Sequence, residues 1–234
     1  MSVLLDRLRE AATPIRLALW RRTSVGRGSY IDPTVQLIGA RNVRVGSDCV
    51  IGEGSWINVN HRTAHEARIS IGDKSLIGRR NFISSGASID IAPFCLTGAD
   101  CSFVGADHVT HDPTTPYAAT GATDVAVISV GANCWFGGGA LVLGNVAIGM
   151  GSVIGARSVI LRDIPPFSVV VGTPARVIRR FGFAQREWVD IVSFTEEDEA
   201  SIPEVAAYLA QLKTNAAEFK LPRKAAGYRR GHIY

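Results

Sequence analysis

The chain has 234 residues, of which 47% are hydrophobic and 20% are charged, and its formal net charge is +4. The mean hydropathy is +0.15. This composition excludes a disordered or collagen-like chain and leaves room for one large domain or two small ones. No apolar run reaches the roughly 18 residues that a membrane-spanning helix requires, and no secretory leader pattern is present, so we expect a cytoplasmic protein.

The cysteines and the basic charge carry no metal or nucleic-acid signal. Cys49, Cys95, Cys101 and Cys134 stand in apolar surroundings without a CxxC pair, which predicts small core residues rather than disulfides or a zinc site. The isoelectric point is near 9.0. Because there is no zinc-finger spacing, RNA-binding aromatic motif or long Lys/Arg block, we expect no nucleic-acid partner and no metal.

The first predicted element is an N-terminal helix. Residues 1–22 place Leu4, Leu5 and Leu8 at helical spacing, with arginines on the opposite face. We assign residues 1–24 to an amphipathic helix that caps the domain following it. Weak association with an anionic membrane surface is the alternative, since basic amphipathic helices bind such lipids.

Residues 25–180 contain a repeat of six residues. Each block opens with an aliphatic or aromatic residue, usually has Gly second, and places a small or modest residue fifth. The clearest run starts at Val130 and reads VGANCW, FGGGAL, VLGNVA, IGMGSV and IGARSV, and the same rule reads VGSDCV from Val45 and IGDKSL from Ile71. Such a unit suits a short strand followed by a tight turn, with equivalent residues stacking on one another.

Three such units make one triangular coil, so the period predicts an all-β solenoid. Glycine in second position is explained either by a positive φ or by close approach of another backbone. The register slips by two residues between Leu37 and Val45 and between Ile83 and Ile91. The repeat breaks at residues 58–68 and 107–127, which predicts loop insertions at corners of the solenoid, where functional residues commonly lie.

Residues 181–234 are predicted to form a helical extension. Ser201-Ile-Pro-Glu204 matches a capping box, and it precedes Val205, Leu209 and Leu212 at helical spacing.

Histidine is the chemically informative residue type. Apart from it the repeat offers no catalytic group: there is no GxSxG elbow, HExxH pair or phosphate-binding GxxxxGKS. His108 opens the long insertion in FVGADHVTHDPTTPY, and His111 follows. The ordinary pKa of an imidazole, near 6.5, suits proton abstraction from a hydroxyl or an amine at neutral pH.

The hexapeptide pattern and the stretch NCWFGGGALVLGNVAIGMGSVIGARSVILRDIPPFSVVVGTPARVIRR resemble the hexapeptide-repeat acyltransferases. The likeness is to sugar O-acetyltransferases of the maltose, galactoside and nodulation type and of the colanic-acid type. It implies a left-handed parallel β-helix, a cytoplasmic homotrimer with sites between subunits, and acetyl transfer from acetyl-CoA to a sugar or polysaccharide precursor in surface polysaccharide, lipopolysaccharide or glycoside synthesis. Counted from the repeat at Ile91, the family's catalytic base falls on His108, with His111 in reserve.

The resemblance also implies the binding residues. The pantetheine arm of acetyl-CoA would lie along Trp135, Gly138 and Ala156, and Arg162, Arg176 and Arg179 would bind its phosphates, since the guanidinium fork matches phosphate oxygens. For Trp135 plain packing is the alternative. The sugar acceptor would contact Asn58, Asn60 and Asp107, with Asp112 as a further candidate, and Asp107 or a main-chain carbonyl would orient His108.

Other readings of the sequence remain open. Within the transferases, the acceptor is an amino-sugar or an antibiotic amine instead of a hydroxyl. A γ-type carbonic anhydrase uses the same solenoid, and His65, His108 and His111 are its candidate zinc ligands. A non-catalytic scaffold is the third.

Overall fold

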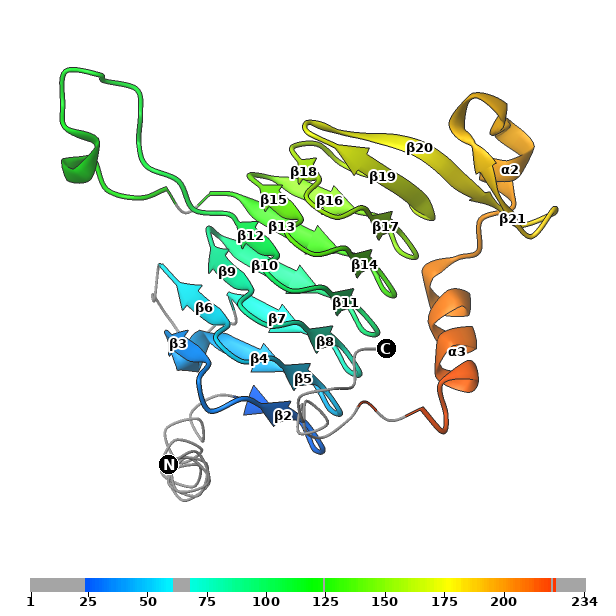
Figure 1. Ribbon diagram of the computed structural model, residues 1–234, viewed down its shortest axis with the longest axis horizontal. Helices are drawn as coiled ribbons and strands as arrows, with labels where there is room; N and C mark the ends of the chain where they lie inside the picture. The colour runs from blue at the N-terminus through cyan, green and yellow to red at the C-terminus, as the bar shows by residue number, and fades with distance from the viewer. Residues whose placement is uncertain (1–23, 61–67, 124, 220, 222–234) are drawn as a thin grey trace, which may run out of the picture.

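The computed structural model describes residues 24–60, 68–123, 125–219 and 221. Over residues 24–160 the chain passes through three sheets in turn, and strands three places apart pair in parallel (Figure 1). Sheet A contains β1 (Ser24–Val25), β4 (Val43–Val45), β7 (Ile69–Ile71), β10 (Ser88–Ile91), β13 (Val127–Val130) and β16 (Val146–Ile148). Sheet C contains β3 (Gln36–Ile38), β6 (Trp56–Val59), β9 (Phe82–Ser85), β12 (Ser102–Val104), β15 (Leu141–Leu143) and β18 (Val159–Ile160).

Sheet B lies between them in chain order and continues into the C-terminal region. It contains β2 (Tyr30–Ile31), β5 (Val50–Ile51), β8 (Leu76–Ile77), β11 (Leu96–Thr97), β14 (Trp135–Phe136), β17 (Val153–Ile154), β19 (Ser168–Gly172), β20 (Ala175–Gly182) and β21 (Glu187–Asp190). The predicted all-β architecture of parallel sheets is confirmed, and each coil of the resulting stack contains one strand from each sheet.

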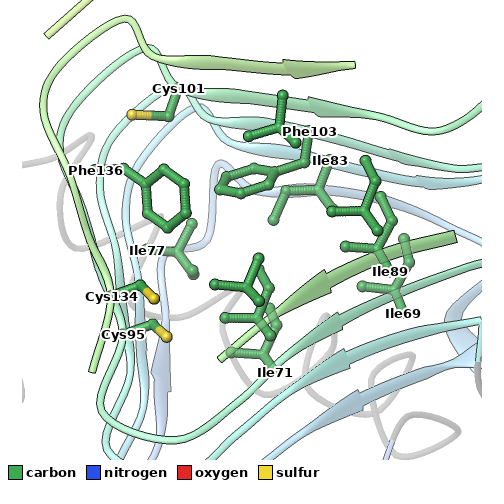
Figure 2. Packing of buried hydrophobic residues seen from close by; sticks show 14 of the residues in the cluster. Ile69, Ile71, Ile77, Ile83, Ile89, Cys95, Cys101, Phe103, Cys134 and Phe136 are labelled. Atoms are coloured by element: carbon green, nitrogen blue, oxygen red, sulfur yellow. The ribbon is translucent and has the colours of Figure 1, made fainter. Parts of the chain in front are cut away.

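The period of six selects the core. The residues that open the blocks point into the stack, where Phe103 and Phe136 meet edge to face at 5.0 Å (Figure 2). The block-opening residues from Val130 onward are all buried: Val130, Phe136, Val142, Ile148, Ile154 and Ile160.

The predicted core position of the four cysteines is also confirmed. All four are buried and reduced. Burial raises the pKa of the Cys49 and Cys101 thiols, so both remain protonated small apolar side chains.

The turns between sheets A and B, and between B and C, have a fixed length. Along the stack each contains four residues, for example 131–134 at the A–B corner and 137–140 at the B–C corner. Glycine at the first of these four positions allows close approach: a Cβ on Gly137 would lie 2.5 Å from the backbone nitrogen of Ala156. Positive φ occurs instead at the third position, at Asn133 (57°) and Arg157 (57°). Close approach is therefore the reason for the repeated glycine.

The C–A corner varies. Its connections range from two residues (86–87 and 144–145) to twenty-two (105–126). It takes up the two register slips, at 39–42, which contain η1 (Ala40–Asn42), and at 86–87. Both predicted insertions fall here, although Asn58 and Val59 still belong to β6. The longer insertion, which contains η2 (Tyr117–Ala119), extends well away from the stack (Figure 1). We call residues 105–126 the arm.

The C-terminal region differs from the predicted purely helical extension. β20 runs across the expected boundary at residue 180 and pairs antiparallel with β19 and β21. η3 (Ile191–Ser193), α2 (Glu196–Ala200) and α3 (Val205–Asn215) follow. The predicted helix is confirmed as α3, but the capping box at Ser201 is wrong: Glu204 is the N-cap of α3 and caps it without a side-chain bond. The capping box is at Thr195 and Asp198, at the start of α2.

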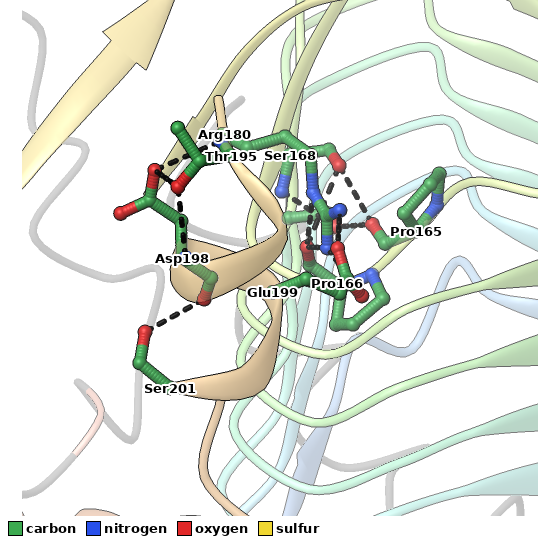
Figure 3. A network of polar contacts seen from close by, with 9 residues as sticks. Pro165, Pro166, Ser168, Arg180, Thr195, Asp198, Glu199 and Ser201 are labelled. Atoms are coloured by element: carbon green, nitrogen blue, oxygen red, sulfur yellow. Dashed lines mark hydrogen bonds and ion pairs between the residues drawn. The ribbon is translucent and has the colours of Figure 1, made fainter. Parts of the chain in front are cut away.

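Arg180 fixes α2 to the end of the stack (Figure 3). Its guanidinium donates to the carbonyl of Pro166, pairs with the carboxylate of Glu199 and lies 4.4 Å above the ring of Phe194. Arg180 as a whole residue is 6% exposed. Its role is therefore structural, in contrast to the exposed arginines beside it.

The predicted helix at residues 1–22 lies outside the described residues, as do His61, His65 and His232. Among the residues that are described, no helix combines the length and apolar character needed to cross a membrane.

Candidate functional site

The arm begins and ends at one point of the C–A corner. The Thr123 backbone N–H donates to the Asp107 carbonyl at 2.6 Å, and the Asp107 N–H donates to Thr123 Oγ1 at 3.2 Å. One residue further on, His108 forms an isolated antiparallel bridge with Ala122. The two ends of the arm are therefore held together where it leaves β12.

His108 stands at this root of the arm. It is exposed, and its backbone N–H donates to Asp107 Oδ1 at 2.7 Å. Its imidazole has no hydrogen-bond partner among the residues that the structure describes. The ring can therefore accept a proton from a bound molecule. The Asp107 carboxylate accepts from the backbone N–H of His108. It makes no hydrogen bond to the imidazole in the described part of the chain, so it does not orient the ring in the way that was one of the two expectations.

His111 and Asp112 lie further out on the arm. His111 is exposed. Hydrogen bonds from the Thr114 hydroxyl, the Thr114 backbone and the Thr115 hydroxyl hold the pKa of the Asp112 carboxyl below its ordinary value. The carboxylate of Asp112 is thus engaged within the arm itself.

The two predicted asparagines lie at the same corner, two coils from the root of the arm. Asn58 pairs in register with Ser84, which pairs with Val104 of β12. At ~4.8 Å per coil, this places them about 10 Å along the stack from the last residue of β12. The Asn60 amide donates to Ser84 Oγ at 2.8 Å and the Asn58 amide to Asn60 Oδ1 at 2.7 Å. These bonds stabilise the corner. Ser84 was not among the residues predicted from the sequence.

The predicted pantetheine residues form a column around sheet B and its corner with sheet C. Trp135 stacks between Leu96 and Val153 and is 52% exposed, so it is not a core residue. Gly138 and Ala156 occupy the second position of successive B–C corners. Neither backbone N–H has an acceptor in the described part of the chain. Two free donors one coil apart suit the amide carbonyls of an extended ligand.

Two of the three predicted phosphate-binding arginines come together. Arg162 follows β18 at the C–A corner, and Arg176 lies on β20; both line a small cavity of about 100 Å³ with Leu161 and Pro174. Arg179 lies further along β20, where it pairs with Asp190 in the strand register. A bulge between Val169 and Val170 leaves Arg176 and Arg179 both exposed, although residues three apart in a regular strand face opposite sides.

The candidate site thus spans two corners that border sheet C. Gly138 and Ala156 lie at the B–C corner, whereas His108 and Arg162 lie at the C–A corner. A larger cavity of about 450 Å³ lies elsewhere, between sheet A and the first turns of α3, and none of the predicted catalytic or binding residues lines it. The described residues contain no group of three or more His, Cys, Asp or Glu positioned to hold a metal, and His65 lies outside them.

A parallel stack built on a hexapeptide repeat, with an exposed histidine at an insertion, matches what the resemblance to hexapeptide-repeat acyltransferases implies. No family model matches the chain. It is 30% identical over 167 residues to a protein of Mycobacterium tuberculosis named as a probable acetyltransferase, a match that covers 70% of this chain and 52% of the relative. Proteins of several Staphylococcus aureus strains with acetyltransferase names are 57% identical over 53 residues, which cover 23% of this chain and 27% of each relative.

Solved structures share the fold. A hexapeptide-repeat-containing acetyltransferase from Vibrio cholerae is 25% identical, with a TM-score of 0.50, over 75% of this chain and 87% of that one. The N-acyltransferase AntD from Bacillus cereus, in complex with dTDP and 3-hydroxybutyryl-CoA, has a TM-score of 0.57 at 20% identity over 67% of this chain and 82% of that one. The predicted resemblance to hexapeptide-repeat acetyltransferases is confirmed, while the chain spans about half the length of the first curated relative and less of the others.

Proposed function

We propose that the protein is an acetyl-CoA-dependent O-acetyltransferase that acts on a hydroxyl of a sugar or polysaccharide precursor, with His108 as general base. The observation that carries the proposal is the placement of the exposed His108 imidazole, which has no partner among the described residues, at the same corner of the stack as Arg162. Arg162 in turn shares a small cavity with Arg176. Such an enzyme must remove the proton of the acceptor hydroxyl and must bind the phosphates of CoA. The acetyltransferase names of the curated relatives support the same reaction.

The proposed reaction is a direct transfer. The imidazole of His108 accepts the proton of the acceptor hydroxyl while the oxygen attacks the thioester carbonyl of acetyl-CoA. The tetrahedral intermediate then collapses, the carbon–sulfur bond breaks, and the proton passes from the imidazolium to the leaving thiolate of CoA. Backbone N–H groups of the glycine-rich corners supply donors for the oxyanion.

Donor binding is assigned to the two corners that border sheet C and to neighbouring residues of sheet B. The unpaired N–H groups of Gly138 and Ala156 would receive the pantetheine arm, with Trp135 beside them, and Arg162, Arg176 and Arg179 would bind the phosphates. Asn58, Asn60 and Asp107 are proposed to contact the acceptor. Asn58 and Asn60 would do so through the hydrogen-bonding atoms that their bonds within the corner leave free.

We also propose that the fold is a left-handed parallel β-helix that works as a homotrimer. The outer faces of sheets B and C carry exposed large apolar side chains, including Leu96, Trp135 and Trp56. On sheet A the outward residues Arg44, Ser70 and Asp90 are polar and pair in register, and Val127 of β13 is an exposed apolar side chain beside them. A ring that packs the B face of one copy against the C face of the next would cover the apolar faces.

The test combines binding and turnover. Calorimetric titration with acetyl-CoA and with desulfo-CoA should show saturable binding without added metal, and release of the CoA thiol should depend on a saccharide acceptor. His108→Ala should lower kcat about 10²- to 10⁴-fold with an unchanged circular dichroism spectrum, whereas His111→Ala should retain turnover. Binding of zinc alone, with hydration of CO₂, would overturn the proposal in favour of a carbonic anhydrase, and acetylation of amino-sugars alone would move the acceptor from hydroxyl to amine.

A further inference from the structure

The backbone around His108 is more tightly held than its exposed position suggests. The Asp107 N–H, the Asp107 carbonyl and the His108 N–H are all hydrogen-bonded, to Thr123 Oγ1, to the Thr123 N–H and to Asp107 Oδ1. The Val109 N–H also donates to the carbonyl of Gly121, at 3.3 Å. The direction in which the histidine side chain leaves the backbone is therefore fixed, while the ring itself has no partner among the described residues.

Thr123 makes two of these bonds. The Thr123 backbone N–H donates to the Asp107 carbonyl, and the Thr123 hydroxyl oxygen accepts from the Asp107 N–H. Thr123 is half-buried. No other side chain among the described residues links the outgoing end of the arm to the returning end. Of the bonds that join the two ends of the arm, the one to Thr123 Oγ1 is the bond that a side-chain substitution can remove.

We infer that Thr123 is a positioning residue for His108, which holds the root of the arm so that the imidazole meets the acceptor hydroxyl. This inference rests on the proposed function. It assigns no proton transfer to Thr123, whose hydroxyl accepts a hydrogen bond from a backbone N–H one residue before the base. Reaction rates depend steeply on such alignment, since a misplacement of about 1 Å can cost about 100-fold.

The matched variants are Thr123→Val, which removes the hydroxyl and keeps the branched shape, and Thr123→Ser, which restores it. Thr120→Val is the control. The Thr120 hydroxyl donates to the Tyr117 carbonyl at 2.9 Å within the arm, away from its root. We expect Thr123→Val to lower kcat about 10- to 100-fold, with the KM for acetyl-CoA within about twofold of the wild-type value. Thr123→Ser should recover most of the loss, and Thr120→Val should change neither quantity.

A double-mutant cycle separates positioning from a general structural role. If Thr123 acts through His108, Thr123→Val should have no further effect on the residual rate of His108→Ala. Equal losses in the two backgrounds would overturn the inference, as would a Thr123→Val enzyme with wild-type kcat. An inactive wild-type protein would instead reject the proposed function, so the two failures are distinguishable.

Discussion

The A–B and B–C corners of the stack contrast with the C–A corner. Among the described residues, the first two corners contain four residues in every coil, and apart from Asp32 the first of the four is glycine or alanine. The third ranges from two residues to twenty-two. The strands on either side of it nevertheless keep one register, because β12 pairs with β15 and β13 pairs with β16. Insertions of any length are therefore compatible with the stack at this corner.

This difference separates the residues that build the core from His108 and the proposed acceptor residues. The fixed corners bring the block-opening residues over one another and build the core. The variable corner carries His108, Arg162 and the Asn58–Ser84 contacts, none of which the core requires. Substitutions of core-forming residues at the fixed corners should therefore mainly lower the stability, whereas substitutions at the variable corner should mainly lower the activity.

The largest effect on unfolding is expected for the core residue next to Trp135. Phe136 is fully buried and packs on Phe103. Phe136→Ala should lower the free energy of unfolding by about 3–5 kcal/mol. Trp135→Ala should lower it by about 1 kcal/mol or less because half of that side chain is exposed, and should instead raise the KM for acetyl-CoA. Denaturant unfolding and steady-state kinetics measure the two quantities, and an unchanged KM would reduce Trp135 to a packing residue.

The next contrast compares two glycines at different corners. A Cβ on Gly137 would lie 2.5 Å from the backbone nitrogen of Ala156, whereas a Cβ on Gly144 would have nothing within 4 Å. Gly137→Ala should therefore cost about 2–3 kcal/mol of stability. Gly144→Ala should cost about 1 kcal/mol, owing to its positive φ of 80°. Equal costs in chemical denaturation would show that the fixed corners can open without penalty.

The regular part of the molecule could be predicted because each block repeats the same physical constraint. A buried opener such as Ile77 and a buried fifth residue such as Cys134 recur wherever the strand and turn recur. A glycine in the sequence is compatible with both close backbone approach and a positive φ, and only coordinates distinguish the two. Asn133 and Arg157 adopt positive φ without glycine. Asparagine is enriched in that conformation, but the residue type of Arg157 carries no such signal.

The C–A corner and the C-terminal region were less predictable. Residues in an insertion follow no period, so the contacts of Thr123 with Asp107 and of Asn60 with Ser84 could be found only from coordinates. The capping box was misplaced because Ser201-Ile-Pro-Glu204 and Thr195-Glu-Glu-Asp198 share one pattern, and packing decides which is used. GTPARVIRR likewise contains the exposed Arg176 and the buried Arg180 without a difference in residue type.

A smaller loss is expected at the cap of α2. The Thr195 hydroxyl accepts a bond from the Asp198 N–H at 3.2 Å, and the Asp198 carboxylate accepts from the Thr195 N–H at 3.0 Å. Thr195→Ala should lower the stability by about 1 kcal/mol, as measured by thermal unfolding. Turnover should be unchanged, because neither residue lies at the C–A corner; a large loss of activity would connect α2 to the site.

The same cap should respond to acid. The Thr195 backbone N–H, the Gln185 amide and the Thr195 hydroxyl all donate to Asp198 and lower the pKa of its carboxyl. The stabilising effect is therefore complete above the unfolded pKa of about 3.9 and is lost as the pH falls through the lower folded value. The difference in Tm between wild type and Asp198→Asn should accordingly shrink below about pH 4. A difference that grows in acid would contradict this sign.

The smallest effect on unfolding is expected for the most drastic change at the C–A corner, replacement of residues 105–126 by the Gly-Asn pair found at 144–145. β12 and β13 should accept this connection, because they pair in register with β15 and β16, which it already joins. Each halving of a flexible connection recovers only about 0.6 kcal/mol, so Tm should stay the same or rise slightly while acetyl transfer disappears with His108. A variant that fails to fold would show that the arm stabilises the stack. A variant that folds and still transfers acetyl groups would show that the catalytic base lies outside the arm.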